Sequence, residues 1–210
     1  MAFDELVVSF FVDEVVGGFF VNVPPGHVAA IYDLGRGVLP KVKKPGLHLK
    51  IPFWQKAKLF NAQILEYTIH KGFKPKNKEA LGDEAIRAVT ADNKHIEVEG
   101  SILFRVDKTK VNEIWENIGE DFVSKIVRPV SRSRIRAVLS EVTTQDLISR
   151  RTEVERKIQE ELNKFFNPKG LICEGFLLSE VKDLGKLETA RDDKVLFKRE
   201  EEELRSKDKA

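Results

Sequence analysis

The residue types that enzymes and metal sites use are sparse and widely separated in this sequence. Four histidines stand singly, and none has a second His or Cys at the spacing of a metal site: His27, His48, His70 and His95. Cys173 is the only cysteine, so the chain can form neither an internal disulfide nor a thiolate cluster. The motifs GxxxxGKS/T, GxGxxG, GxSxG and HExxH do not occur. The sequence therefore predicts no catalytic residue, no cofactor and no metal site.

Two further features could carry chemistry but fit a structural role better. Glu97 and Glu99 lie two apart on a predicted strand, on the face opposite its apolar residues, where paired carboxylates are usually solvated. Cys173 lies inside the apolar run 171–181, where we expect a packed small side chain rather than a nucleophile. A site assembled from distant residues is conceivable, but nothing in the sequence argues for an enzyme.

Basic residues raise the question of phosphate binding. Four arginines gather within nine residues: Arg128, Arg132, Arg134 and Arg136. No aromatic residue is interleaved among them for base stacking, so nucleic acid is not expected as a partner. We expect the arginines to lie over the apolar surface of an amphipathic helix, or to pair with acids such as Glu120, Asp121 and Glu141.

Charge is distributed unevenly along the 210 residues, although the net charge is only +2. Residues 1–34 carry five acids and no Lys or Arg, whereas residues 35–80 carry eleven basic residues and two acids, a local net charge of +9. Such a block could face anionic lipid or another phosphate. It is more typical of lysines that alternate with buried residues on half-exposed strands. The 41 % hydrophobic and 33 % charged composition indicates a folded domain.

The elements that position these residues begin with strands. Pro24, Pro25 and Gly26 form a rigid turn, because proline fixes φ and glycine adopts conformations that other residues avoid. Strands are then expected at 28–32, 38–39, 47–51, 57–69, 85–90 and 95–106, with a lysine-rich loop at 71–83. The last of these strands is the clearest, because residues 96, 98, 102, 104 and 106 share one apolar face at period two.

Helices dominate the second half of the chain. Asp107 is expected to cap a short helix that stops at Gly119, and Pro129 predicts a kink or restart near residue 128 in the next helix. Thr144 is expected to cap a third helix, whose apolar stripe is Leu147, Val154, Ile158, Leu162 and Phe165. A last strand is predicted at 171–181.

The apolar run from Leu6 to Val23 is interrupted by Asp13 and Glu14. Each carboxylate at the centre of a spanning helix costs roughly 2.5–3.5 kcal/mol, which disfavours a simple transmembrane helix. The acidic start also differs from a secretory signal. Two alternatives remain: a membrane-dipping hairpin, or a segment packed on this domain or a neighbouring subunit. The expected membrane-contact residues are Phe10, Phe11, Val12, Val15, Val16, Phe19 and Phe20.

Several motifs jointly resemble one domain family: VPPG, GRGV, PGLHLKIPF, TADN with its following strand, and VRPVSRSRIRAV. From about Phe20 to Val181 the sequence resembles the SPFH or band 7 family of stomatins, prohibitins and flotillins, with a prohibitin-like or stomatin-like character. The resemblance implies an α+β fold, a curved and mainly antiparallel sheet with packed helices. It also implies a non-enzymatic protein that sits on membranes through its N-terminal segment. Such proteins self-assemble into rings or cages that enclose membrane microdomains and often membrane proteases.

The predicted organisation has three parts: an N-terminal hydrophobic segment at 1–20, the SPFH domain at 21–182, and a short charged helix or coiled-coil start at 183–210. In the last part Ala190, Phe197 and Leu204 recur at spacing seven and are the expected oligomerisation positions. Pro24, Pro25 and Gly26 are the expected hinge between the N-terminal segment and the domain.

The function predicted from this organisation is a membrane-associated scaffold with its domain on the cytoplasmic side. Its expected partners are further copies of itself, membrane lipids and, by resemblance, a membrane-bound AAA protease. The alternative is a soluble oligomeric binding module whose N-terminal segment packs on a neighbouring subunit.

Overall fold

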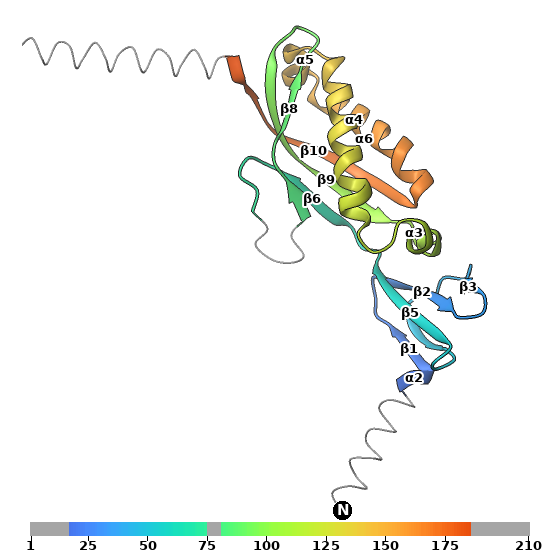
Figure 1. Cartoon of the computed structure of the whole chain (residues 1–210). Coiled ribbons are helices and arrows are strands. Elements are labelled where there is room, and N and C mark those ends of the chain that lie inside the picture. The colour runs from blue at the N-terminus through green and yellow to red at the C-terminus, as the bar shows by residue number, and fades with distance from the viewer. Residues whose placement is uncertain (1–16, 75–80, 186–210) are drawn as a thin grey trace, which may run out of the picture.

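The computed structural model describes residues 17–74 and 81–185, which form two modules joined end to end (Figure 1). Most of the predicted membrane-contact residues and the predicted seam lie outside the described residues: Phe10, Phe11, Val12, Val15 and Val16, and Ala190, Phe197 and Leu204. The smaller module holds a short helical turn and five strands: α2 (Gly17–Phe19), β1 (Phe20–Val23), β2 (His27–Asp33), β3 (Gly37–Val38), β4 (Gly46–Leu49) and β5 (Gln55–Asn61).

The larger module holds the other strands and the long helices (Figure 1). Its strands are β6 (Leu65–Ile69), β7 (Leu81–Asp83), β8 (Ile86–Val89), β9 (His95–Val106) and β10 (Leu171–Asp183). Its helical elements are α3 (Val111–Asn117), a π-helical segment η2 (Val123–Val127), α4 (Arg128–Ser140), α5 (Thr144–Ser149), α6 (Arg151–Phe166) and a 3-10 turn η3 (Asn167–Lys169).

The smaller module is built around β2. This strand lies between β3 and β5, both antiparallel to it, and a separate antiparallel ribbon pairs β1 with β4. A bridge between Ala29 and Lys43 ties β2 to the chain just before the ribbon. Val21, Val23 and Ala29 form a small buried cluster against Ala57. The ribbon is therefore held on the sheet by one of its two faces.

In the larger module, β9 is the central strand of the sheet. It pairs with β10 along one edge and with β6 and β8 along the other, all antiparallel. Its predicted apolar residues are at most 1 % exposed and share one core with α4 and α6, which cover one face of the sheet in Figure 1. Gly100 lies on the same strand, and only glycine fits at this position, because a Cβ would come within 2.5 Å of the Leu177 carbonyl oxygen. The predicted α+β fold with a mainly antiparallel sheet is confirmed.

The predicted break near Pro129 is confirmed, since η2 gives way to α4 at Arg128. The prediction that Thr144 caps the third helix is wrong by one residue. Thr143 is the cap, because its hydroxyl accepts from the Asp146 N–H and Asp146 lies three residues on, completing a capping box. The helix is also interrupted at Arg150, which separates α5 from α6.

Three predicted details differ from the structure. Phe166, not Phe165, completes the buried stripe of α6, since Phe166 is 0 % exposed and Phe165 is 39 % exposed. The predicted loop 71–83 ends in strand β7, which pairs in parallel with β6. The predicted strand 57–69 is two strands, and the break between β5 and β6 is where the modules join.

Candidate functional site

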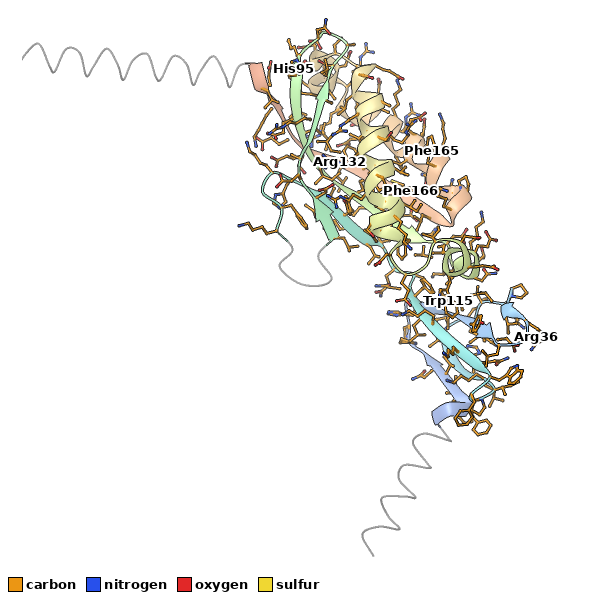
Figure 2. All side chains as sticks on the ribbon, viewed as in Figure 1. Arg36, His95, Trp115, Arg132, Phe165 and Phe166 are labelled. Atoms are coloured by element: carbon orange, nitrogen blue, oxygen red, sulfur yellow. The ribbon has the colours of Figure 1, made fainter. Side chains whose placement is uncertain are left out.

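The histidines do not converge. His95 lies at the far end of the larger module (Figure 2), whereas His27 and His48 belong to β2 and β4 of the smaller module. The ring nitrogens of His27, His48 and His70 instead contact the backbone carbonyls of nearby residues at 3.2, 2.6 and 2.9 Å. Within residues 17–74 and 81–185, no three His, Cys, Asp or Glu side chains gather as a metal site would require.

Cys173 is 1 % exposed, as expected for a packed side chain. Burial raises the pKa of its thiol to about 12, and its Sγ lies 3.6 Å from the Gly175 carbonyl oxygen. Because the thiolate is the nucleophilic form, this thiol is inert at neutral pH. The prediction of a structural role is confirmed.

The arginine cluster stabilises the fold, but not through the acids that we expected. Arg128 and Arg132 both donate to Asp83 of β7, at 2.9 and 2.8 Å to its Oδ2. Burial alone would raise the pKa of Asp83, but these hydrogen bonds outweigh burial and lower it. The arginines therefore fasten β7 to α4.

The remaining arginines are also occupied within the larger module. Arg134 lies over the ring of Phe165 at 4.5 Å, and Arg136 donates to the Arg87 carbonyl at 3.1 Å. Two of the three acids predicted as their partners bind lysines instead: Glu120 pairs with Lys58, and Glu141 pairs with Lys157, both at 2.6 Å.

The prediction that Glu97 is solvated is wrong. It is 3 % exposed, because cationic side chains from neighbouring elements lie against it. Arg87 of β8 reaches one carboxylate oxygen at 3.4 Å, and Lys71 reaches the other at 3.6 Å. Glu99 is likewise ion-paired, with Lys182 at 3.2 Å. These carboxylates form cross-strand ion pairs rather than an acid–base pair.

Figure 1 places α2 and β1 at the free end of the smaller module. The most distinctive surface is found there, where apolar side chains of α2, β1, β4 and the adjoining turns are exposed. We call it the apolar tip and define it by eight residues, all between 40 and 86 % exposed: Phe19, Phe20, Leu34, Leu47, Leu49, Ile51, Phe53 and Trp54. The backbone N–H of Leu34 donates to the Trp54 carbonyl at 3.1 Å, and that of Lys50 donates to the Phe19 carbonyl at 2.8 Å, which brings these segments together. A cluster of exposed apolar residues of this kind marks an interaction site in soluble proteins.

Strand register explains most of the tip. On the ribbon, Phe20 lies opposite Leu49, and Leu47 lies opposite Asn22. Since side chains alternate along a strand, Leu47, Leu49 and Ile51 line the outer face while Val21 and Val23 fill the inner one. The ribbon is thus apolar on both faces, and only the inner face is covered by the described residues.

The aromatic end of the tip is a fixed turn. Phe53 has φ 61° and is 86 % exposed. A non-glycine residue in this region is strained, and such strain is characteristic of functional sites. The Trp54 N–H donates to Pro52 at 2.7 Å, and the Gln55 N–H donates to Ile51 at 2.8 Å. The turn therefore holds two aromatic side chains in solvent.

A buried carboxylate anchors this turn. The Gln55 side chain donates to Asp33 at 2.8 Å and accepts from the Ile51 N–H at 3.1 Å. Asp33 is 1 % exposed and also binds Arg36 at 3.1 Å. The hydrogen bond from Gln55, followed by that from Arg36, lowers the pKa of Asp33 to about 2, so it remains ionised.

Of the predicted membrane-contact residues, Phe19 and Phe20 are described, and both lie on the apolar tip. Sequence reasoning missed the rest of the tip. The available signal was the row Leu47, Leu49 and Ile51 followed by the Phe53-Trp54 pair, which reads equally well as a core-facing strand.

The predicted hinge forms a turn in which the His27 N–H donates to the Pro24 carbonyl at 3.2 Å and Gly26 has φ 79°. The turn joins β1 to β2, and the Gly26 carbonyl accepts from Ala62, next to the start of β6. It lies at the junction of the two modules, one strand away from the apolar tip. A hinge role for Pro24, Pro25 and Gly26 stays a prediction.

None of the helices in the described part of the chain has the length and apolar character needed to cross a bilayer.

Comparisons with known proteins agree with the fold. The sequence model described as SPFH domain / Band 7 family matches residues 21–210. The chain is 26 % identical to Prohibitin 1 of Gallus gallus over 167 residues, which are 80 % of this chain and 56 % of that protein. It is 22 % identical over 144 residues to Prohibitin-7, mitochondrial, of Arabidopsis thaliana (69 and 46 %), and 23 % over 141 residues to Prohibitin-2 of Saccharomyces cerevisiae (67 and 41 %).

The chain spans about half the length of these relatives. The prohibitin-like character expected from its motifs is confirmed. Because the family match covers nearly all of the sequence, this chain belongs to the SPFH domain / Band 7 family.

Proposed function

We propose that this protein is a non-enzymatic, membrane-associated scaffold that assembles with copies of itself. The observation that carries the proposal is the apolar tip. Its side chains are held outward by strand register and by the turn at Phe53, and the described residues leave them uncovered. A bilayer interface accepts such a surface, because tryptophan and phenylalanine favour the headgroup region and aliphatic side chains favour the acyl chains.

Family membership supports the assembly part of the proposal. In the form expected from the family, protomers abut through this domain and form a ring or cage around a membrane microdomain, with a membrane-bound AAA protease as a possible client. The N-terminal segment before Gly17 would enter or lie on the same membrane as the apolar tip, because α2 belongs to that end of the module. The domain would then project from the cytoplasmic face.

A second candidate is a soluble oligomeric module in which the tip is covered by protein. The charge distribution favours it, since the acidic residues 1–34 complement the basic residues 35–80. In this arrangement the N-terminal segment of one copy would cover the apolar tip of another copy.

Vesicle flotation with the full chain separates the two candidates. The tip variant replaces Leu49 and Ile51 with Ser. A matched control replaces Leu177 and Ile148, which are 51 and 72 % exposed in the larger module. The scaffold predicts that wild type and control float, that the tip variant floats less than either, and that light scattering still detects oligomers of the tip variant. Oligomers that never float, or equal flotation of the two variants, would favour the soluble module.

A further inference from the structure

We propose that the apolar tip selects anionic lipid surfaces, and that Lys50 and Lys56 supply the selectivity. This inference rests on the proposed function, because it names the class of lipid that the same surface contacts. It is carried by the charges that surround the tip rather than by the tip itself.

The smaller module is strongly basic. Residues 17–61 contain seven Lys and Arg and one acid, Asp33, which gives a net charge of +6. That acid is 1 % exposed and already bound to Arg36 and Gln55. The described surface of this module therefore presents no exposed carboxylate of its own against an anionic partner.

Two of the lysines adjoin the tip in the sequence, one after β4 and one at the start of β5. Lys50 lies between Leu49 and Ile51, on the opposite face of the ribbon from their side chains, and its backbone N–H donates to the Phe19 carbonyl at 2.8 Å. Lys56 follows the aromatic turn by two residues and pairs with Tyr32 in the sheet register.

Neither of these lysines makes an ion pair with another described residue, whereas Lys58 is taken up by Glu120 at 2.6 Å. A lysine beside an inserted apolar residue can extend its stem along the acyl boundary and place its ammonium group among lipid phosphates. The positions of Lys50 and Lys56 therefore suit them to contact headgroups once the tip inserts.

The same charges could attract nucleic acid, but the composition of the tip favours lipid. Base stacking uses aromatic faces along a basic groove. Here half of the apolar tip is aliphatic, including the row Leu47, Leu49 and Ile51, which a nucleic acid would leave exposed to water. Acyl chains and anionic headgroups together match both the apolar row and the adjoining lysines.

The test measures partition of the full chain onto vesicles of phosphatidylcholine alone and onto vesicles with about 30 % phosphatidylserine. The lysine variant carries Lys50→Gln and Lys56→Gln. The control carries Lys108→Gln and Lys169→Gln, two exposed lysines of the larger module that make no ion pair with described residues. Each variant removes the same charge from the chain.

We expect the wild type to prefer the anionic vesicles. The lysine variant should bind the anionic vesicles roughly 25-fold more weakly than the wild type does, about fivefold for each lysine. It should match the wild type on neutral vesicles, and the control should match the wild type on both. Raising the salt concentration should weaken binding of the wild type to anionic vesicles until it approaches that of the lysine variant, because salt screens exposed charges.

Three results would overturn the inference. Equal binding of wild type to both vesicle types would show that the tip contacts lipid without charge selectivity, and the proposed function would stand. Binding to neither vesicle type would defeat the proposed function as well. The third result concerns a single-stranded oligonucleotide. If it binds the wild type as tightly as anionic vesicles do, and this binding is lost when Lys50 and Lys56 are replaced, the surface would be assigned to nucleic acid.

Discussion

Replacing Phe53 with Asn tests the apolar tip where it is most exposed. An aromatic residue presents roughly 200 Å² of surface, of which Phe53 exposes 86 %. At about 25 cal/mol per Å², complete transfer of that area into lipid is worth about 4 kcal/mol. Insertion to the headgroup boundary buries about half of it, so the substitution should weaken vesicle binding by about 2 kcal/mol, roughly 30-fold.

Asn is chosen because it tolerates positive φ better than other polar residues, so the turn at φ 61° should persist. The matched control is Ile148→Asn on α5, where the native side chain is 72 % exposed. Binding is measured by titrating vesicles against protein fluorescence, and Tm is measured without vesicles. The assignment of the tip is refuted if both variants bind vesicles as the wild type does. It is also refuted if Phe53→Asn weakens binding only because it unfolds the protein, which a large drop in Tm would show.

Three further predictions concern the fold. Gly100→Ala should lower the free energy of unfolding in urea by about 2–3 kcal/mol, since its Cβ would meet a carbonyl oxygen at 2.5 Å; Gly175→Ala, with nothing within 4 Å, should cost less than about 1 kcal/mol. Phe166→Ala should cost about 3–5 kcal/mol and Phe165→Ala about 1 kcal/mol, because Phe166 is buried and Phe165 is 39 % exposed beneath a cation; equal losses would contradict the stripe. Burial raises the pKa of Asp83, but its arginine hydrogen bonds lower it overall, so it stabilises the fold above pH ~4 and loses this effect as pH falls further. Asp83→Asn should therefore lower Tm at pH 7 and flatten the fall in Tm below about pH 4; a parallel pH profile would refute this.

Period-two alternation was sufficient to predict β9, since its apolar positions recur over twelve residues. The same rule failed for Glu97, because alternation assigns a residue to a face and does not say what covers that face. Arg87 and Lys71 cover it, one of them from a strand paired with β9 and the other from the chain after β6.

Local rules settled some positions and left others open. Threonine is a common cap residue, so Thr143 and Thr144 are both candidates by type. Only Thr143 has an acid three positions later, so the capping box could have identified it. Phe165 and Phe166 are different, because both fit a 3.6-residue period after Leu162, and only the packing of α6 on the sheet decides between them.

The apolar tip could not be located from the sequence alone. Leu47, Leu49 and Ile51 have the pattern of a strand with one buried face, and a sequence does not show whether a second layer covers that face. In the structure β4 pairs only with β1 among the described strands, and the inner side of this ribbon takes up the available core. The outer row is left exposed for that reason.

The most direct measurement of the central claim is quenching of Trp54 by lipids that carry bromine on their acyl chains. The chain has two tryptophans, so Trp115→Phe leaves Trp54 as the only one. Trp115 lies in the larger module (Figure 2), where its ring is edge-on to that of Tyr32 with 6.4 Å between the ring centres. A membrane-bound scaffold predicts that brominated vesicles quench Trp54 strongly, with a blue-shifted emission. Vesicle-bound protein whose Trp54 emission is unchanged would contradict contact between the apolar tip and the membrane.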